Sequence, residues 1–315
     1  MTAIVLWSAW ASTPDDLARA VPDDRVLTIT DEAQLASASD AEIAFAGLNP
    51  ERVRKLLAAL PNLRWMHTPA AGVDRIVDLP ELRARGVTVT NNSGSYDAQI
   101  AEHVMACVYA ASKRLHVYRD QQARREWRDH PHTEVRDAVM VVYGMGSIGG
   151  EVARLAAAVG MRVIGVRRRA APRGSSARVV PPDALADVAA EADYLAICAP
   201  LTAATRGAVS REVIARMKPT AWIVNIARGA IADEAALMEA LRSGRLGGAA
   251  IDAFSDEPLP PDSPWWSLEN VIVTPHASNS SPRLKDRTLA LFVENLRRYK
   301  AGEPLLNQVD FGAGY

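Results

Sequence analysis

A glycine-spaced turn between two apolar segments restricts the fold of this chain more than any other feature. In "YGMGSIGGEVARLAAAVG", Gly144, Gly146 and Gly149 have the spacing G-x-G-x-x-G. The pattern predicts a strand over 138–144, a helix after the turn and a second strand from Met161. In such a unit the backbone approaches a pyrophosphate at the start of the helix, where the helix dipole favours negative charge. We therefore expect a dinucleotide-binding Rossmann domain whose turn, Gly144, Met145, Gly146, Ser147, Ile148 and Gly149, contacts the cofactor.

Short apolar runs alternate with helical patterns through most of the 315 residues, which is typical of α/β architecture with parallel sheets. The length favours two domains. We expect two Rossmann-like or flavodoxin-like parallel-sheet domains with a cleft between them. The substrate domain is expected over 1–98 plus 281–315 and the dinucleotide-binding domain over 99–280. A long helix is predicted from Asp97 to Arg125, at the junction of the two domains.

Three arginines follow the second strand of the glycine-turn unit, in "GMRVIGVRRR". At this place an acidic residue usually accepts the ribose hydroxyls of NAD. Arg167 and Arg168, and with less support Arg169, can instead bind a 2′-phosphate through charge-assisted hydrogen bonds. The sequence therefore predicts NADP(H) in preference to NAD(H). The alternative is a solvated basic turn that binds no ligand.

Composition limits the classes of partner and the cellular location. A formal net charge of −1 argues against a generic nucleic-acid or anionic-membrane binder. Cys107 and Cys198 lie in apolar runs, so we expect small buried thiols and no disulfide. His130 and His132 have no neighbouring ligand cluster, so no metal is expected. The N-terminal segment lacks the pattern of a signal peptide and no long apolar span follows, which predicts a cytoplasmic protein.

Charged side chains follow three predicted strands in the second half of the chain. Arg228 follows "VNIA", Asp252 and then Glu257 follow "GGAAI", and His276 follows "NVIVTP". Ligands of open α/β sheets bind outside the carboxyl ends of the strands, so these segments are expected to converge on one site. An arginine, a glutamate and a histidine beside a nicotinamide suit the reduction of an α-keto acid.

With these motifs in view, the chain resembles the D-isomer-specific 2-hydroxyacid dehydrogenase family over nearly its whole length. The resemblance rests on "AAGVDRI", "VTNN…IAEHV", "YGMGSIG", "APLTAAT", "VNIARG", "DAFSDEPLP" and "NVIVTPH", in the order and spacing of the family. The segments "GMRVIGVRRR" and "LPPDSPWW" are most similar to the NADP-preferring glyoxylate/hydroxypyruvate reductases. The resemblance also implies a homodimer joined through the cofactor domains.

The resemblance implies a role for each site residue. His276 would be the general acid, Glu257 would orient its ring and favour the protonated form, and Arg228 would hold the substrate carboxylate and polarise the carbonyl. Asp252 would accept a hydrogen bond from the nicotinamide carboxamide. The remaining cofactor contacts implied are Pro200, Thr202, Ile226 and Ala227. The substrate contacts implied are the backbone of Ala71, Gly72 and Val73, together with Tyr96.

Structural alternatives stay open for several of these residues. Asp252 can instead cap a strand end, and Tyr96 can pack in the core. His67 and His103 are expected to have structural partners. Two other functions are consistent with the sequence: an NAD-linked dehydrogenase of a larger 2-hydroxy acid, and a dinucleotide-sensing binding protein without turnover.

Overall fold

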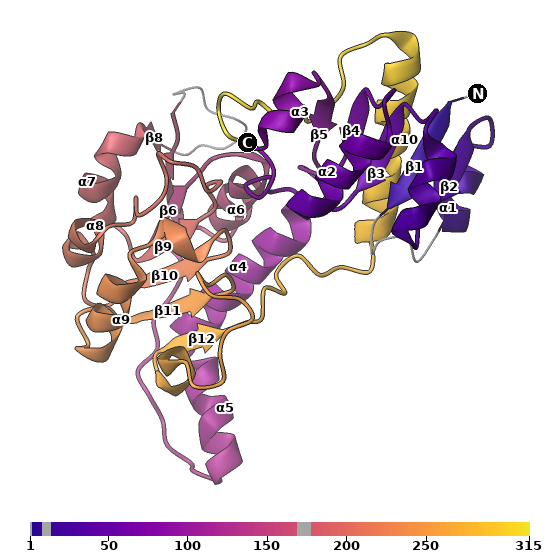
Figure 1. Cartoon of the computed structure of the whole chain (residues 1–315). Coiled ribbons are helices and arrows are strands. Elements are labelled where there is room, and N and C mark those ends of the chain that lie inside the picture. The colour runs from indigo at the N-terminus through magenta and orange to yellow at the C-terminus, as the bar shows by residue number, and fades with distance from the viewer. Residues whose placement is uncertain (1, 8–13, 169–177) are drawn as a thin grey trace. The chain divides into compact units, whose positions relative to one another are not determined.

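The computed structural model describes residues 2–7, 14–168 and 178–315, which form two compact units (Figure 1). Unit 1 comprises Met1–Tyr96 and Ser281–Tyr315, and unit 2 comprises Asp97–Ser280. Both units are built on parallel sheets, as the fold class predicted.

Unit 1 contains a five-stranded parallel sheet of order β2-β1-β3-β4-β5. Its strands are β1 (Ala3–Trp7), β2 (Arg25–Thr28), β3 (Ile43–Ala46), β4 (Trp65–His67) and β5 (Thr88–Thr90). Its helices are α1 (Pro14–Ala20), α2 (Pro50–Ala59), α3 (Pro80–Ala84) and α10 (Leu284–Ala301), with the 3₁₀ helix η2 (Glu32–Ala38).

Both faces of this sheet are buried, as expected for a parallel sheet covered by helices on each side. Alternate residues of the central strands point to opposite faces. One face, which includes Val5 and Met66, packs against Leu56 of α2. The other, which includes Leu6, packs against Phe292 of α10. The C-terminal helix therefore completes the core of the unit that the N-terminus begins.

Unit 2 contains a seven-stranded parallel sheet of order β12-β11-β10-β9-β6-β7-β8. Its strands are β6 (Val139–Tyr143), β7 (Arg162–Val166), β8 (Arg178–Val180), β9 (Tyr194–Ile197), β10 (Trp222–Asn225), β11 (Gly248–Ile251) and β12 (Val271–Val273). Its α-helices are α4 (Asp97–Ser112), α5 (Leu115–Arg124), α6 (Ser147–Ala158), α7 (Leu185–Ala189), α8 (Arg211–Arg216) and α9 (Glu234–Arg242). Its 3₁₀ helices are η3 (Pro182–Ala184), η4 (Gly229–Ile231) and η5 (Pro264–Ser267).

The strand order of unit 2 reverses at β6. The chain proceeds from β6 to β7 and β8 on one side, then returns to β9 and continues to β12 on the other. Such a topological switch point is where doubly wound sheets bind their ligands, at the carboxyl ends of the strands.

The prediction of one long helix from Asp97 to Arg125 is wrong, because the structure has the two helices α4 and α5 there. The chain turns between α4 and α5, and Arg114 has a left-handed φ of 52°. The helix α4 is buried along much of its length, whereas α5 has only Gln121 buried. The buried residues that hold α4 against the core end before the turn. Because α5 buries only Gln121, core packing does not keep α5 in line with α4.

Two strands were not expected, β2 and β8. Each lies at an edge of its sheet and has side chains that are exposed or half-buried. Edge strands pair on one side only, so they need fewer apolar residues and give a weak sequence signal. Among the described residues, no helix is both long enough and apolar enough to cross a membrane.

Candidate active site

The glycine turn connects β6 to α6, and two of its glycines have no room for a side chain. Gly144 has a φ of +101°, and a Cβ there would lie 2.4 Å from the backbone nitrogen of Ala199. A Cβ on Gly149 would lie 1.9 Å from the carbonyl oxygen of Gly144. Glycine alone permits both this conformation and this close packing of helix on strand.

The middle glycine faces open space. Gly146 is the N-cap of α6 and provides no side-chain cap, and a Cβ there would have no atom within 4 Å. The helix start can therefore offer its N–H groups to an anion that approaches along this side. Met145 packs its side chain against Gly165 and is buried, so only its backbone can contact a ligand. This cradle fits the pyrophosphate of a nicotinamide dinucleotide.

The arginines lie at the end of the neighbouring strand β7. Val166 pairs with Tyr143, so Arg167 follows β7 at the same sheet edge as the glycine turn. The N–H of Arg167 donates to the carbonyl oxygen of Val180 at 3.0 Å. The side chain of Arg167 is half-buried and that of Arg168 is exposed, while Arg169 lies outside the described residues. Arg167 and Arg168 therefore lie at the carboxyl end of β7, next to the glycine turn, and their contact with a 2′-phosphate stays a prediction.

On the other side of the switch point, a compact turn follows β9. The hydroxyl of Thr205 donates to the carbonyl oxygen of Pro200 at 2.6 Å, and the N–H of Thr202 donates to that hydroxyl at 2.8 Å. Pro200 is exposed and Thr202 is half-buried. The turn therefore presents both predicted cofactor contacts at the carboxyl edge of the sheet.

Asn225, at the end of β10, fixes the turn that presents Arg228. Its side chain is buried, donates to the carbonyl oxygen of Arg228 at 3.0 Å and accepts from the N–H of Ala227 at 3.1 Å. Ile226 is buried, so Ala227 and Arg228 are the residues of this turn that reach the surface of the unit. Sequence reasoning missed Asn225, although a polar residue at the end of the apolar run "WIVN" is a signal of such a role.

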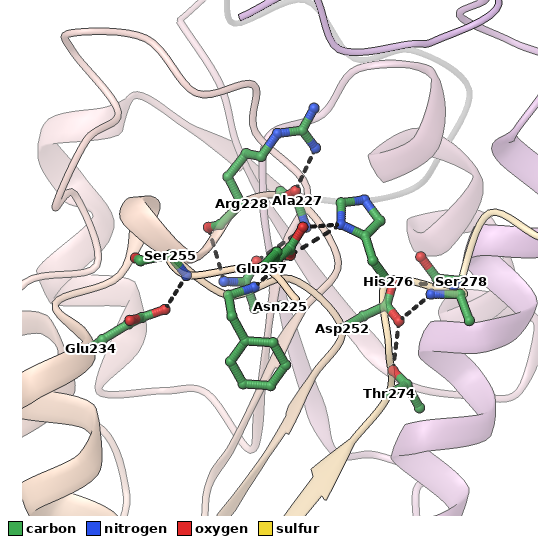
Figure 2. Close-up of polar contacts among 12 residues, drawn as sticks. Asn225, Ala227, Arg228, Glu234, Asp252, Ser255, Glu257, Thr274, His276 and Ser278 are labelled. Atoms are coloured by element: carbon green, nitrogen blue, oxygen red, sulfur yellow. Dashed lines mark hydrogen bonds and ion pairs between the residues drawn. The ribbon is translucent and has the colours of Figure 1, made fainter. Parts of the chain in front are cut away.

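Glu257 and His276 form a direct pair (Figure 2). The Nδ1 atom of His276 lies 2.9 Å from Oε2 and 3.1 Å from Oε1 of Glu257. The Oε1 atom also accepts the N–H of Phe254 at 2.8 Å, which holds the carboxylate in place. Because Nδ1 faces the carboxylate, Nε2 is the ring nitrogen that can exchange a proton with another molecule.

The three segments converge because their strands are neighbours in one parallel sheet. Arg228 follows β10, Asp252 and Glu257 follow β11, and His276 follows β12. Their carboxyl ends therefore lie along one edge, and Figure 2 shows the three loops meeting there.

Asp252 is almost completely buried, with 1% of its surface exposed. Its Oδ1 accepts the hydroxyl of Thr274 at 2.6 Å and the N–H of Ala277 at 2.8 Å, and its Oδ2 accepts the N–H of Ser278 at 3.1 Å. Burial raises the pKa of this carboxyl, but hydrogen bonds from Ser278, Thr274 and Ala277 outweigh it and hold the pKa below its ordinary value. These contacts correspond to the strand-end cap, and a contact with a carboxamide would be an additional one.

The expected substrate residues lie in unit 1 and have structural contacts there. The carbonyl oxygen of Ala71 accepts from Asn91 at 2.8 Å, and the side chain of Val73 is buried in the core. The Tyr96 hydroxyl donates to the carbonyl oxygen of Pro69, and burial raises its pKa. Tyr96 therefore has the core contacts of the structural alternative, and the substrate roles of Ala71, Gly72, Val73 and Tyr96 stay predictions.

The histidine-rich segment after α5 has protein partners. His132 Nε2 lies 2.9 Å from the hydroxyl of Tyr118, and His130 Nε2 lies 2.9 Å from the side-chain nitrogen of Gln121. In the described part of the chain, no group of three or more histidine, cysteine or acidic residues could hold a metal ion.

Residues 105–278 match the model of the D-isomer specific 2-hydroxyacid dehydrogenase, NAD binding domain. The chain is similar to a glyoxylate reductase of Korarchaeum cryptofilum, with 36% identity over 79% of this chain and 76% of the relative. It is 34% identical to a D-3-phosphoglycerate dehydrogenase of Mycobacterium tuberculosis over 82% of this chain, but spans only 49% of that longer relative.

Solved structures of similar proteins match this chain over its whole length. The chain is similar to an NADPH-dependent glyoxylate/hydroxypyruvate reductase from Sinorhizobium meliloti, whose crystal structure contains NADP and sulfate. The TM-score is 0.85, the sequence identity is 28%, and the match covers 100% of both chains.

Proposed function

The chain belongs to the D-isomer specific 2-hydroxyacid dehydrogenase family, and we propose that it reduces small 2-keto acids with NADPH. Glyoxylate and hydroxypyruvate are the first substrates to test, because the names of the relatives from Korarchaeum and Sinorhizobium include them. The observation that carries the proposal is the pair of His276 and Glu257, at 2.9 Å, beside the loop of Arg228 (Figure 2).

His276 is the general acid of the proposed reaction. Glu257 accepts a hydrogen bond at Nδ1, orients the ring and stabilises its positive charge, so Nε2 can give a proton to the keto oxygen. In the reverse direction the neutral ring takes that proton back. The second hydrogen bond of Glu257, from the N–H of Phe254, fixes the carboxylate and therefore the ring.

Arg228 binds the substrate. A guanidinium can form paired hydrogen bonds with a carboxylate, and its positive charge polarises the neighbouring carbonyl. Asn225 holds the backbone of this arginine at 3.0 Å, which fixes the starting point of the side chain. The reaction needs this grip because hydride transfer requires a fixed distance and angle at the keto carbon.

The glycine turn and the arginines bind the cofactor, which when bound supplies the hydride. Gly144, Gly146 and Gly149 accommodate the pyrophosphate. The other proposed cofactor contacts are Pro200, Thr202, Ala227 and the backbone of the buried Ile226. Arg167 and Arg168 bind the 2′-phosphate and so favour NADPH. Asp252 already accepts hydrogen bonds from Thr274, Ala277 and Ser278. The proposed hydrogen bond from the nicotinamide carboxamide would be an additional one.

A substrate and cofactor screen tests the proposal. Oxidation of NADPH and NADH is followed at saturating cofactor with glyoxylate, hydroxypyruvate, pyruvate and a bulkier 2-keto acid. We expect turnover of the small keto acids, a higher kcat/KM with NADPH, and a loss of kcat of about a hundredfold or more in His276→Ala. The affinity for NADPH, measured by fluorescence, should not change in that variant.

Three results would contradict the proposal in different ways. Retained turnover in His276→Ala would remove the acid role, and a clear preference for NADH would remove the 2′-phosphate role. Tight NADPH binding without turnover of any keto acid would favour the dinucleotide-sensing function. Preference for the bulkier keto acid with NADH would favour the NAD-linked dehydrogenase.

We also propose a cytoplasmic homodimer joined through unit 2. The segment after α4 supports this, because it bears large exposed apolar side chains at Leu115 and Trp127. Figure 1 shows α5 extending away from the sheet of its unit. Exposed aromatic side chains of this kind are typical of interface anchors.

A further inference from the structure

The short segment 274–279 carries His276 in an unusual backbone conformation. His276 has a φ of 51°, which non-glycine residues rarely adopt, and its N–H donates to the carbonyl oxygen of Thr274 at 3.0 Å. A backbone conformation of this kind persists only where neighbouring contacts hold it.

Asp252 supplies the first set of these contacts. Its carboxylate binds Thr274 before the histidine, and Ala277 and Ser278 after it. One buried anion thus ties together both ends of the tight turn that contains His276. Three donors on a carboxylate with 1% exposure form a rigid anchor, because breaking any of them leaves a buried polar group unsatisfied.

Helix α4 supplies the second set. Gln99, His103 and Cys107 lie one helical turn apart and therefore share one face of α4. The side-chain nitrogen of Gln99 donates to the carbonyl oxygen of Asn279 at 3.4 Å, and His103 Nε2 lies 3.4 Å from the hydroxyl of Thr274. Burial, together with the nearby Asp252 carboxylate, raises the pKa of the Cys107 thiol to about 12.

The distances determine the direction of the hydrogen bonds. The single hydroxyl hydrogen of Thr274 goes to Asp252, since the two oxygens lie 2.6 Å apart and the carboxylate has no hydrogen to give. For a hydrogen bond between that oxygen and His103, Nε2 of His103 must then be the donor. The result is a chain of two hydrogen bonds, in which His103 donates to Thr274 and Thr274 donates to Asp252.

We propose that the Thr274 hydroxyl and the Asp252 carboxylate are positioning residues of the catalytic histidine, fixed to α4 through His103. This inference rests on the proposed role of His276 and adds the groups that hold it. The charged and titratable groups near the loop of His276 are His103 and Cys107 of α4, Asp252 after β11, and Glu257 beside the imidazole ring. Neither Thr274 nor Asp252 needs to touch the substrate to act in this way.

A pair of substitutions at Thr274 tests the proposal. Thr274→Val removes the hydroxyl with little change of volume, whereas Thr274→Ser keeps it. We expect kcat for the keto acid to fall about tenfold or more in Thr274→Val, with an unchanged KM for NADPH, and most of it to be recovered in Thr274→Ser. Thr220→Val, at an exposed position of the same unit, controls for the substitution itself.

A second readout does not depend on turnover. The His276 ring is followed by NMR of histidine-labelled protein at one pH, with His276→Ala used to assign the signal. A histidine released from its fixed place beside Glu257 should show shifted and broadened ring signals in Thr274→Val, but not in Thr274→Ser. Absence of turnover in the parent protein would contradict the proposed function and leave this test intact.

The proposal is overturned if Thr274→Val keeps both the parent kcat and the parent ring signals of His276. It is also overturned if Thr274→Ser is as impaired as Thr274→Val. Should Thr274→Val fail to fold, His103→Leu and His103→Gln provide the same comparison, because glutamine keeps an N–H donor and leucine does not. Equal kcat and equal His276 ring signals in those two variants would overturn it as well.

Discussion

At the scale of single residues, the site depends on side chains whose partners fix their direction. Asn225 holds the Arg228 turn, and Phe254 holds the carboxylate of Glu257. Each of these contacts joins residues only a few positions apart, within a loop that follows one strand. The sequence motifs therefore contain both the site residues and the neighbours that hold them.

Replacement of Arg167 and Arg168 by serine is expected to change the cofactor preference. Loss of the guanidinium groups should raise the KM for NADPH about tenfold to a hundredfold, because each charge-assisted contact with a 2′-phosphate is lost. The KM for NADH should change little. Steady-state kinetics with both cofactors measures the ratio of the two kcat/KM values.

Arg162→Ser provides the matched control, since Arg162 is exposed at the amino end of the same strand β7. That variant should keep the parent preference. An unchanged preference in the Arg167→Ser/Arg168→Ser protein would show that the arginines form only a solvated basic turn.

At the scale of elements, strand β4 carries a buried histidine in an aromatic environment. Burial lowers the pKa of His67 to about 3, and its Nε2 has no hydrogen-bond partner among the described residues. Its ring lies 5.2 Å from that of Phe45 and 5.6 Å from that of Phe292. His67 was expected to have a structural partner, and the structure shows Thr90, whose hydroxyl lies 2.9 Å from Nδ1.

This histidine is expected to make the fold sensitive to acid. The folded pKa of about 3 lies below the ordinary value of 6.5, so between these values the unfolded chain binds a proton that the folded chain does not. The free energy of unfolding should therefore fall as the pH decreases from about 6.5 towards 3, by up to about 1.4 kcal/mol per pH unit from this group. Urea denaturation at several pH values measures the slope.

His67→Phe should reduce that slope by as much as one proton while it keeps an aromatic ring in the cluster. Substitution of a histidine that is not buried, His132→Gln, should leave the slope unchanged. Identical slopes in His67→Phe and the parent would mean that His67 is protonated in the folded state or titrates normally there.

The elements also show where the sequence signal was insufficient. Apolar runs predicted the central strands of both sheets, since these are buried on both faces and need continuous apolar residues. The sequence did not predict the edge strands β2 and β8 or the turn between α4 and α5. Edge strands are only partly covered, and the turn at Arg114 depends on where the core stops supporting the helix.

At the scale of the whole molecule, the proposed homodimer makes a prediction about Trp127. This side chain is fully exposed in the single chain, so it should be covered in a dimer joined through unit 2. Trp127→Asp is expected to raise the dimer dissociation constant at least tenfold, because a charge replaces a large apolar anchor. Analytical ultracentrifugation over a range of concentrations measures the constant.

Leu306→Asp is the control for this experiment, as Leu306 is also exposed but belongs to unit 1. It should leave the association unchanged. A parent protein that sediments as a monomer at all concentrations would contradict the dimer, and equal weakening by both variants would contradict its location.

The sequence alone determined the class of fold, the glycine turn and the family, because these depend on short-range patterns: apolar periodicity, glycine spacing and motifs that follow strands. Tertiary structure decided what the polar residues bind. Asp252, a predicted cofactor contact, turns its carboxylate to the loop of His276, and Tyr96 donates to a carbonyl of its own unit. Hydrogen bonds between residues far apart in the chain depend on which strands become neighbours and on how deeply each group is buried. Local sequence patterns determine neither property.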